Sequence, residues 1–157
     1  MQLSDIFLAL GEAGFTQLLR TVSIGKLKTY QLYERVKFRF HLQKLNAESL
    51  RKAAPKLYAR VGSRDEEFAT DMAQVILVSH LDMIKDALDH LGVPHDDGFF
   101  AKDLDPKAYF TEGWQQRAFD HLKSKYPEAL IIFYINHLDW ELMKSETIFS
   151  PAPVAAN

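Results

Sequence analysis

The chain has 157 residues, of which 47% are hydrophobic and 25% charged, an ordinary composition for a soluble globular domain. It contains no cysteine, which excludes a disulfide framework, a thiolate metal site and a cysteine nucleophile. The formal net charge of −2 conceals a strong segregation. Residues 20–64 carry twelve Lys and Arg against two acids, whereas residues 65–157 carry seven Lys and Arg against seventeen acids.

Two patterns bear on where the protein resides. Residues 1–15 contain no basic side chain, so they do not resemble a secretory signal. The longest uninterrupted apolar run covers residues 129–135, far short of the ~20 residues that span a bilayer. We therefore expect a cytoplasmic protein without a membrane partner.

The N-terminal third predicts short helices. Apolar residues recur at helical spacing over residues 3–10 and 15–22. Residues 24–45 favour another helix, although residues 36–43 alternate apolar and polar side chains as a strand does, so both alternatives stay open. Asn46 is a good N-cap for a helix that begins at the next residue, and Pro55 is expected to kink or split that helix.

The strongest helical pattern begins at the charge boundary. Ser63 and Glu66 match a capping box, and apolar residues then recur as far as Leu91. Gly92 and Pro94 form a standard stop signal. The pattern predicts one long central helix over about 64–91, followed by a loop over residues 94–111.

The remaining residues complete an all-α architecture. Helical spacing returns over residues 114–126, and Pro127 is suited to open a last helix. Residues 150–157 are small and uncharged, which predicts a disordered tail. We expect a single-domain bundle of six to seven helices over residues 1–149.

Two histidines fall on the apolar sides of helices. His80 lies in the middle of the apolar side of the long helix, and His137 does so in the last helix, with Glu141 one turn later. Buried imidazoles and carboxylates need partners. If the two helices were neighbours, these residues with Tyr134 would form a buried polar site able to serve as an acid–base pair or a metal centre. The alternative is that each histidine is an ordinary core residue with a hydrogen-bond partner. This interpretation is favoured, because most buried polar groups in proteins are simply hydrogen-bonded. No cofactor or reaction follows from the pattern.

The loop after the long helix gathers acids beside a histidine. His95, Asp96 and Asp97 offer ligands that Ca²⁺ or Mg²⁺ would accept, but the spacing of an EF-hand is absent. A solvated acidic loop is the more common meaning of such a cluster.

The basic segment predicts a charged patch. Its members come from residues 24–45 and the helix that follows: Lys28, Arg35, Arg39, Arg51, Lys52, Lys56 and Arg60. With nearby tyrosines for base stacking, residues 20–64 define a nucleic-acid-binding alternative. Solvated or ion-paired helix faces account for the same pattern and are favoured.

The charge split itself gives the leading hypothesis for function. Oppositely charged halves favour antiparallel association of two copies, because a two-fold axis places the basic half of one copy against the acidic half of the other. We expect a non-catalytic interaction domain that forms homo-oligomers, or one that binds a small molecule in an apolar pocket. A buried His/His/Glu metal site or enzyme centre, and nucleic-acid binding, are the alternatives.

Overall fold

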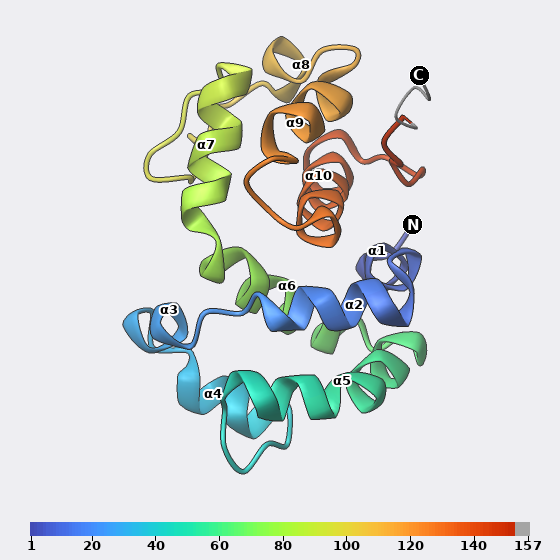
Figure 1. Ribbon diagram of the computed structural model, residues 1–157. Helices are drawn as coiled ribbons and strands as arrows, with labels where there is room; N and C mark the ends of the chain where they lie inside the picture. The colour runs from blue at the N-terminus through green and yellow to red at the C-terminus, as the bar shows by residue number, and fades with distance from the viewer. Residues whose placement is uncertain (153–157) are drawn as a thin grey trace. The chain divides into compact units, whose positions relative to one another are not determined.

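The computed structural model describes residues 1–152, which form ten helices and no strand (Figure 1). The prediction of an all-α helical fold is confirmed, with more helices than the six to seven expected. Contacts cluster in two compact units, one of residues 2–81 and one of Met1 with the chain from Asp82 onward. The single domain over residues 1–149 stays a prediction, and residues 153–157 of the expected tail lie outside the described residues.

The unit of residues 2–81 contains six helices. They are α1 (Leu3–Ala9), α2 (Gly11–Arg20), α3 (Ile24–Thr29), α4 (Tyr33–Arg39), α5 (Ala47–Gly62) and α6 (Glu66–Ser79). Helix α2 lies along α5, and α1 packs against both α5 and α6 (Figure 1). The ring of Phe15 meets Phe7 edge-on, with centroids 6.0 Å apart, and lies 5.3 Å from the ring of Tyr58. These aromatic rings fill the space between helices that are individually too short to be stable.

Residues 24–45 form two short helices instead of one. Gln31 adopts φ 59°, and the N–H of Leu32 donates to the carbonyl of Leu27 at 2.7 Å, which closes α3 in a Schellman-type end. Helix α4 ends in the same way, with His41 at φ 57° and the N–H of Leu42 bonded to the carbonyl of Lys37. Residues 36–43 are therefore a helix end and a turn, and the strand alternative is wrong.

The predicted long helix over 64–91 is also wrong, because the chain leaves helical geometry at His80, with φ −130° and ψ 38°. Ser79 donates to the carbonyl of Val75, a back-bond that bends helices, and its Oγ also accepts the N–H of Ser23 at 3.0 Å. Helix α6 ends at Ser79 and α7 (Leu81–Leu91) begins immediately after. The predicted stop at Gly92 is confirmed, with φ 73° and a bond from the N–H of Val93 to the carbonyl of Leu88.

Helix caps agree with the sequence in part. Asn46 caps α5 as predicted, accepting the N–H of Ser49 at 2.8 Å. Pro55 does not split α5, because it lies on the exposed face where water can bond the carbonyl that the missing N–H leaves free. The cap of α6 is Asp65, which accepts the N–H of Phe68, whereas Ser63 ends α5. An ionised carboxylate is the stronger acceptor at a helix N-terminus, which accounts for the shift of the cap.

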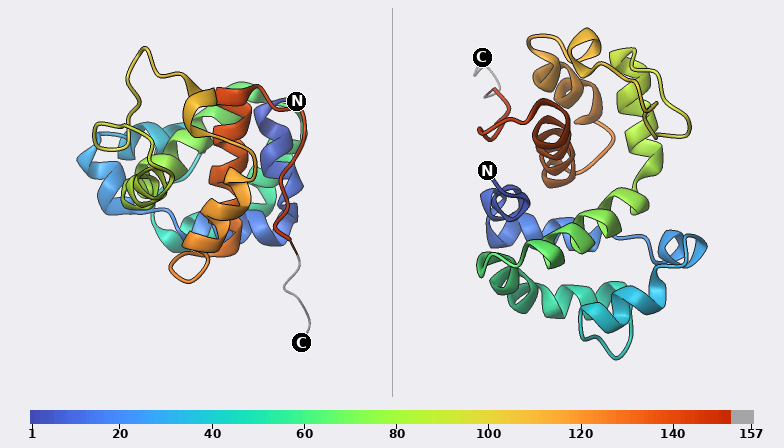
Figure 2. Two further views of the ribbon diagram at one scale, coloured as in Figure 1. Left: turned by 90° about the horizontal axis from the view of Figure 1, so that it is seen from above. Right: turned by 180° about the vertical axis from the view of Figure 1, so that it is seen from behind.

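The unit from Asp82 onward is built around the last helix. It contains most of α7, then α8 (Pro106–Tyr109), α9 (Trp114–Leu122) and α10 (Glu128–Met143). Helix α8 lies inside the predicted loop over 94–111, where Asp105 caps its first turn. Helix α10 is buried on nearly every side, and α8 and α9 pack against it. Residues 144–152, which follow α10, form neither helix nor strand, as Figure 2 shows. No helix among residues 1–152 combines the length and apolar content that crossing a membrane requires.

Candidate functional site

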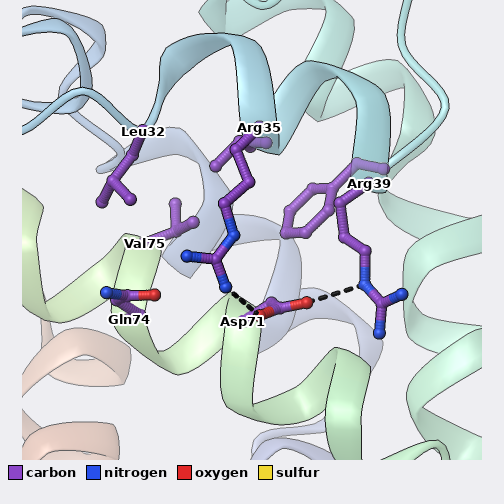
Figure 3. Close-up of a pocket in the computed structure, with 8 residues that line it drawn as sticks. Leu32, Arg35, Arg39, Asp71, Gln74 and Val75 are labelled. Carbon is purple, nitrogen blue, oxygen red and sulfur yellow. Dashed lines mark hydrogen bonds and ion pairs between the residues drawn. The ribbon is translucent and has the colours of Figure 1, made fainter.

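Two arginines of the predicted basic patch are committed to one carboxylate. Arg35 Nη2 lies 3.1 Å from Asp71 Oδ1, and Arg39 Nε lies 2.7 Å from Asp71 Oδ2 (Figure 3). Both arginines come from α4 and the aspartate from α6, so the pairs join two helices. The cleft that they line encloses about 10 Å³, the space of a single water molecule. This part of the patch stabilises the fold and leaves no room for an organic ligand.

A third arginine is held in the same way at the charge boundary. Arg60 Nε lies 3.1 Å from Asp65 Oδ2, its Nη1 donates to the carbonyl of Arg39, and its guanidinium stacks 4.1 Å from the ring centre of Phe68. The N–H of Phe68 lowers the pKa of Asp65, with a further contribution from Arg60, against the opposing effect of burial. Positive charge before residue 65 is therefore neutralised in part by acids directly after it.

The other cations of the patch lie at the surface. Lys28 is placed over the ring of Tyr33, 5.1 Å from its centroid, and Lys52 pairs with Glu48 one turn away on α5. Arg51 and Lys56 are exposed on the same helix. The structure thus separates the predicted patch into arginines that pair with acids of α6 and its N-cap, and exposed cations on α3 and α5.

Lys52 and Lys56 of α5 border a shallow hollow. It has a volume of about 470 Å³ and is lined by the turn over residues 40–44 and by Ser49, Lys52, Ala53 and Lys56 of α5. Lys44 adds a further exposed cation from the turn. Phe38, in the last turn of α4 just before these residues, is 81% exposed. We define the basic surface as Phe38, Lys44, Arg51, Lys52 and Lys56.

Sequence reasoning missed two members of the basic surface, Phe38 and Lys44. A signal for Phe38 was present, because a helix over residues 24–45 carries apolar side chains on two opposite faces and a core covers only one of them. Lys44 follows a turn at which His41 adopts positive φ. The sequence contains no glycine there, so this turn was not predicted.

An acidic surface lies on the other compact unit. Lys85 is 3.8 Å from Asp82 and 3.9 Å from Asp97, and both carboxylates are largely exposed. Asp96 and Phe99 exchange two backbone hydrogen bonds, at 2.8 and 2.9 Å, and the Phe99 side chain is 62% exposed. We define the acidic surface as Asp82, Asp89, Asp96, Asp97 and Phe99.

The predicted metal-binding loop is organised by its histidine. His95 Nδ1 accepts the N–H of Gly98 at 2.9 Å, which places the ring proton on Nε2, and that atom lies 2.7 Å from Asp89. One ring nitrogen is therefore used within the loop and the other by Asp89 of α7. Across residues 1–152, no group of three or more His, Asp or Glu side chains has an arrangement able to hold a metal ion.

His80 has a partner within its own unit. Its Nε2 lies 2.9 Å from Thr21 Oγ1, and because the threonine hydroxyl donates to the carbonyl of Leu18, the histidine is the donor. Burial lowers the pKa of His80, so the ring is neutral near pH 7. The contact accounts for a polar ring on an apolar helix side.

His137 belongs to the other unit and is paired there. Its Nδ1 lies 3.5 Å from Glu141 Oε2, and its ring packs 5.9 Å from those of Phe133 and Trp140. Burial lowers the pKa of His137, while Glu141 acts in the opposite direction. Each histidine thus has a neighbour in its own unit, and the shared His/His/Glu site stays a prediction.

Tyr134 is the unusual member of the predicted buried site. Its hydroxyl is buried and has no hydrogen-bond partner within residues 1–152, and burial raises its pKa, so it remains protonated.

Comparison of the chain with protein-family models, curated proteins and solved structures gave no match in any of the three.

Replacement of Tyr134 by phenylalanine is expected to raise the free energy of unfolding by about 1 kcal/mol, because a buried hydroxyl without a partner carries an uncompensated desolvation cost. Urea unfolding of the variant and the parent chain measures this difference. Tyr58→Phe is the matched control and should destabilise, because the Tyr58 hydroxyl donates to the carbonyl of Leu8 at 3.2 Å. A destabilised Tyr134→Phe chain would show that the hydroxyl has a partner in solution.

Proposed function

We propose that the protein is a non-catalytic interaction domain that self-associates, with the basic surface of one copy against the acidic surface of another. Each surface belongs to a single compact unit, so the proposal needs no particular arrangement of the two units within one chain. It keeps the leading hypothesis of the sequence and assigns it to named residues. The hollow at the basic surface is open and shallow, which suits a protein partner better than an enclosed small molecule.

The observation that carries the proposal is the placement of the two most exposed phenylalanines. Of the large hydrophobic side chains exposed in residues 1–152, Phe38 and Phe99 are exposed the most. Phe38 stands between Lys37 and Arg39 in the sequence, and Phe99 follows Asp96 and Asp97 in the same loop. An aromatic side chain surrounded by charge is typical of an interface, in which a ring is buried at the centre and charged groups form the rim.

The charges left at the surface support the same conclusion. Arg35 and Arg39 form ion pairs with Asp71 of α6, and Arg60 pairs with Asp65, the N-cap of α6. The basic surface is made chiefly of lysines. Strongly hydrated lysines contribute attraction and orientation at an interface rim, and little packing. The acidic surface is complementary, with four carboxylates, of which those of Asp82 and Asp97 lie 3.8 and 3.9 Å from Lys85. Such an interface is weakened by salt, because exposed charges are screened.

Self-association is expected to depend on Phe38. Its replacement by alanine should raise the dissociation constant of the homo-oligomer about tenfold or more, the effect of removing a central aromatic contact. Sedimentation velocity over a concentration series measures this constant. Tyr30→Ala is the matched control, because Tyr30 is another exposed aromatic residue of the same unit, outside the basic surface.

Charge reversal tests the pairing of the two surfaces. The chain with Lys44→Glu and Lys56→Glu should be monomeric, and so should the chain with Asp96→Lys and Asp97→Lys, whereas an equimolar mixture should associate. Wild-type association should weaken between roughly 50 and 500 mM NaCl. A wild-type chain that stays monomeric at low salt would overturn the proposal. If that monomer binds a labelled oligonucleotide and the Lys44→Glu, Lys56→Glu chain does not, the basic surface serves nucleic acid instead.

A further inference from the structure

The segment after α10 is held to the helices by side-chain amides. Asn136 of α10 accepts the N–H of Phe149 on its Oδ1 at 2.7 Å, and its Nδ2 reaches the carbonyl of the same residue at 3.3 Å. Gln116 of α9 accepts the N–H of Ala152 at 2.8 Å. Side chains of two helices therefore form hydrogen bonds with the backbone of an irregular segment at two residues, which are three positions apart in the sequence.

The second component of this contact is aromatic. The ring of Phe149 lies 6.5 Å from that of Phe119, which is 9% exposed on α9. Asn136 is 2% exposed with the segment in place, and its Nδ2 also donates to the carbonyl of Ile132. With the segment in place, both the Oδ1 and the Nδ2 atoms of Asn136 have protein partners, as a polar side chain buried to this extent requires. The two helices thus present side-chain groups that match the backbone N–H and C=O of an extended segment.

We propose that α9 and α10 form a docking site for an extended peptide segment with an aromatic anchor, and that residues 145–152 occupy this site as a built-in competitor. Backbone hydrogen bonds of this kind give affinity without sequence dependence, and the ring contact with Phe119 adds a preference for an aromatic residue. The occupant is a protein partner that presents an extended, uncharged stretch resembling Ile148-Phe149-Ser150. This site is separate from the two charged surfaces and does not depend on self-association through them.

The covalent link between α10 and residues 145–152 determines how strongly this segment competes with a free peptide. A segment joined to the end of α10 competes at an effective concentration in the millimolar range, so a free peptide meets a largely occupied site. Two further ties involve exposed side chains of the segment and are expected to be weak: Glu146 pairs with the ammonium group of Met1, and Ser145 bonds Thr147. A third tie lies where the segment leaves α10, where the N–H of Ser145 donates to the carbonyl of Asp139 at 3.2 Å. Removal of the anchor ring should therefore open the site to a peptide supplied in trans.

The test uses the full chain and a fluorescent peptide with the sequence of residues 144–152. The Phe149→Ala chain should bind this peptide about tenfold more tightly than the wild-type chain in fluorescence anisotropy, because its own segment competes less well. A peptide with alanine in place of the phenylalanine should bind much more weakly. Asn136→Leu in the Phe149→Ala background should abolish binding, and Lys123→Ala, an exposed change on the same unit, should leave it unaltered.

A reversible lock separates docking from misfolding. The chain has no cysteine, so Gln116→Cys with Ala152→Cys introduces a single pair at a contact seen in the structure. The oxidised chain should exclude the peptide, and reduction should restore the binding measured for the single Gln116→Cys chain. Equal peptide binding by the locked and reduced chains, or none by a folded Phe149→Ala chain, would overturn the proposal. Self-association is measured separately, by sedimentation velocity. Failure of the peptide to bind would therefore not bear on the pairing of the basic and acidic surfaces.

Discussion

Replacement of Asp71 by alanine is expected to lower the free energy of unfolding by about 2–3 kcal/mol, one of the two largest effects expected from the structure. The Asp71 side chain is only 17% exposed and receives one arginine on each oxygen. The pair with Arg35 contributes little, because that arginine is mostly exposed and screened. The short bond from the half-buried Arg39 contributes most, and its loss leaves a guanidinium partly desolvated.

Urea denaturation followed by circular dichroism measures the change. Glu67→Ala is the matched control, since Glu67 contacts the same Arg39 at 3.0 Å from an 80% exposed position, and its loss should cost less than about 0.5 kcal/mol. A double-mutant cycle of Asp71→Ala with Arg39→Leu isolates the pair itself. Equal costs for Asp71→Ala and Glu67→Ala would show that the α4–α6 contact rests on Leu32, Val36 and their apolar neighbours alone.

Helix boundaries were predictable where the signal is local. Asn46 caps α5 because an asparagine side chain satisfies a free N–H of the next turn, and Gly92 ends α7 because glycine adopts positive φ without strain. Gln31 and His41 end helices in the same left-handed conformation without that advantage. At the first of these ends, Leu27 and Leu32 are buried on both sides of the turn. Burial of those leucines compensates for the strain, and it depends on helices elsewhere in the chain.

The break at His80 was not predictable for a related reason. The apolar spacing runs through this position without interruption, and no glycine or proline marks it. What interrupts the helix is a pair of contacts to Thr21 and Ser23, almost sixty residues earlier. The same contacts explain why a histidine lies on an apolar helix side, so the polar residue that suggested a site marks a junction between helices.

The charge split along the sequence has a mixed cause. Arginines before residue 65 pair with acids on α6, so part of the split is a network within one unit. Sequence alone could not separate these arginines from the lysines of α5, because both lie on helices with similar spacing. Counted by unit, residues 2–81 hold twelve Lys and Arg against eight acids, and the chain from Asp82 holds seven against thirteen. The segregation is milder than the linear count, and what remains of it lies at the surface.

The protein is expected to lose stability as pH falls from 7 to 5, before its carboxylates are protonated. Burial lowers the pKa of His80 and of His137 in the folded chain below the ordinary value of 6.5. Below that value the unfolded chain binds protons that the folded chain does not, so the free energy of unfolding decreases as pH falls, by up to about 1.4 kcal/mol per pH unit for each histidine. The pKa of Asp65 is lowered from 3.8, chiefly by the N–H of Phe68, so its contribution is lost only below about pH 4.

The two pH windows can therefore be separated by substitution. His80→Gln keeps an N–H near the position of Nε2, and His137→Asn keeps a polar atom near Nδ1, so each variant retains a partner while losing the titration. Urea unfolding at half-unit pH intervals should show a flattened slope between pH 6.5 and 5 in the double variant and an unchanged decline below pH 4. His41→Asn, at an exposed turn, is the matched control. A double variant that retained the full slope above pH 5 would show that the two buried imidazoles do not link protonation to folding.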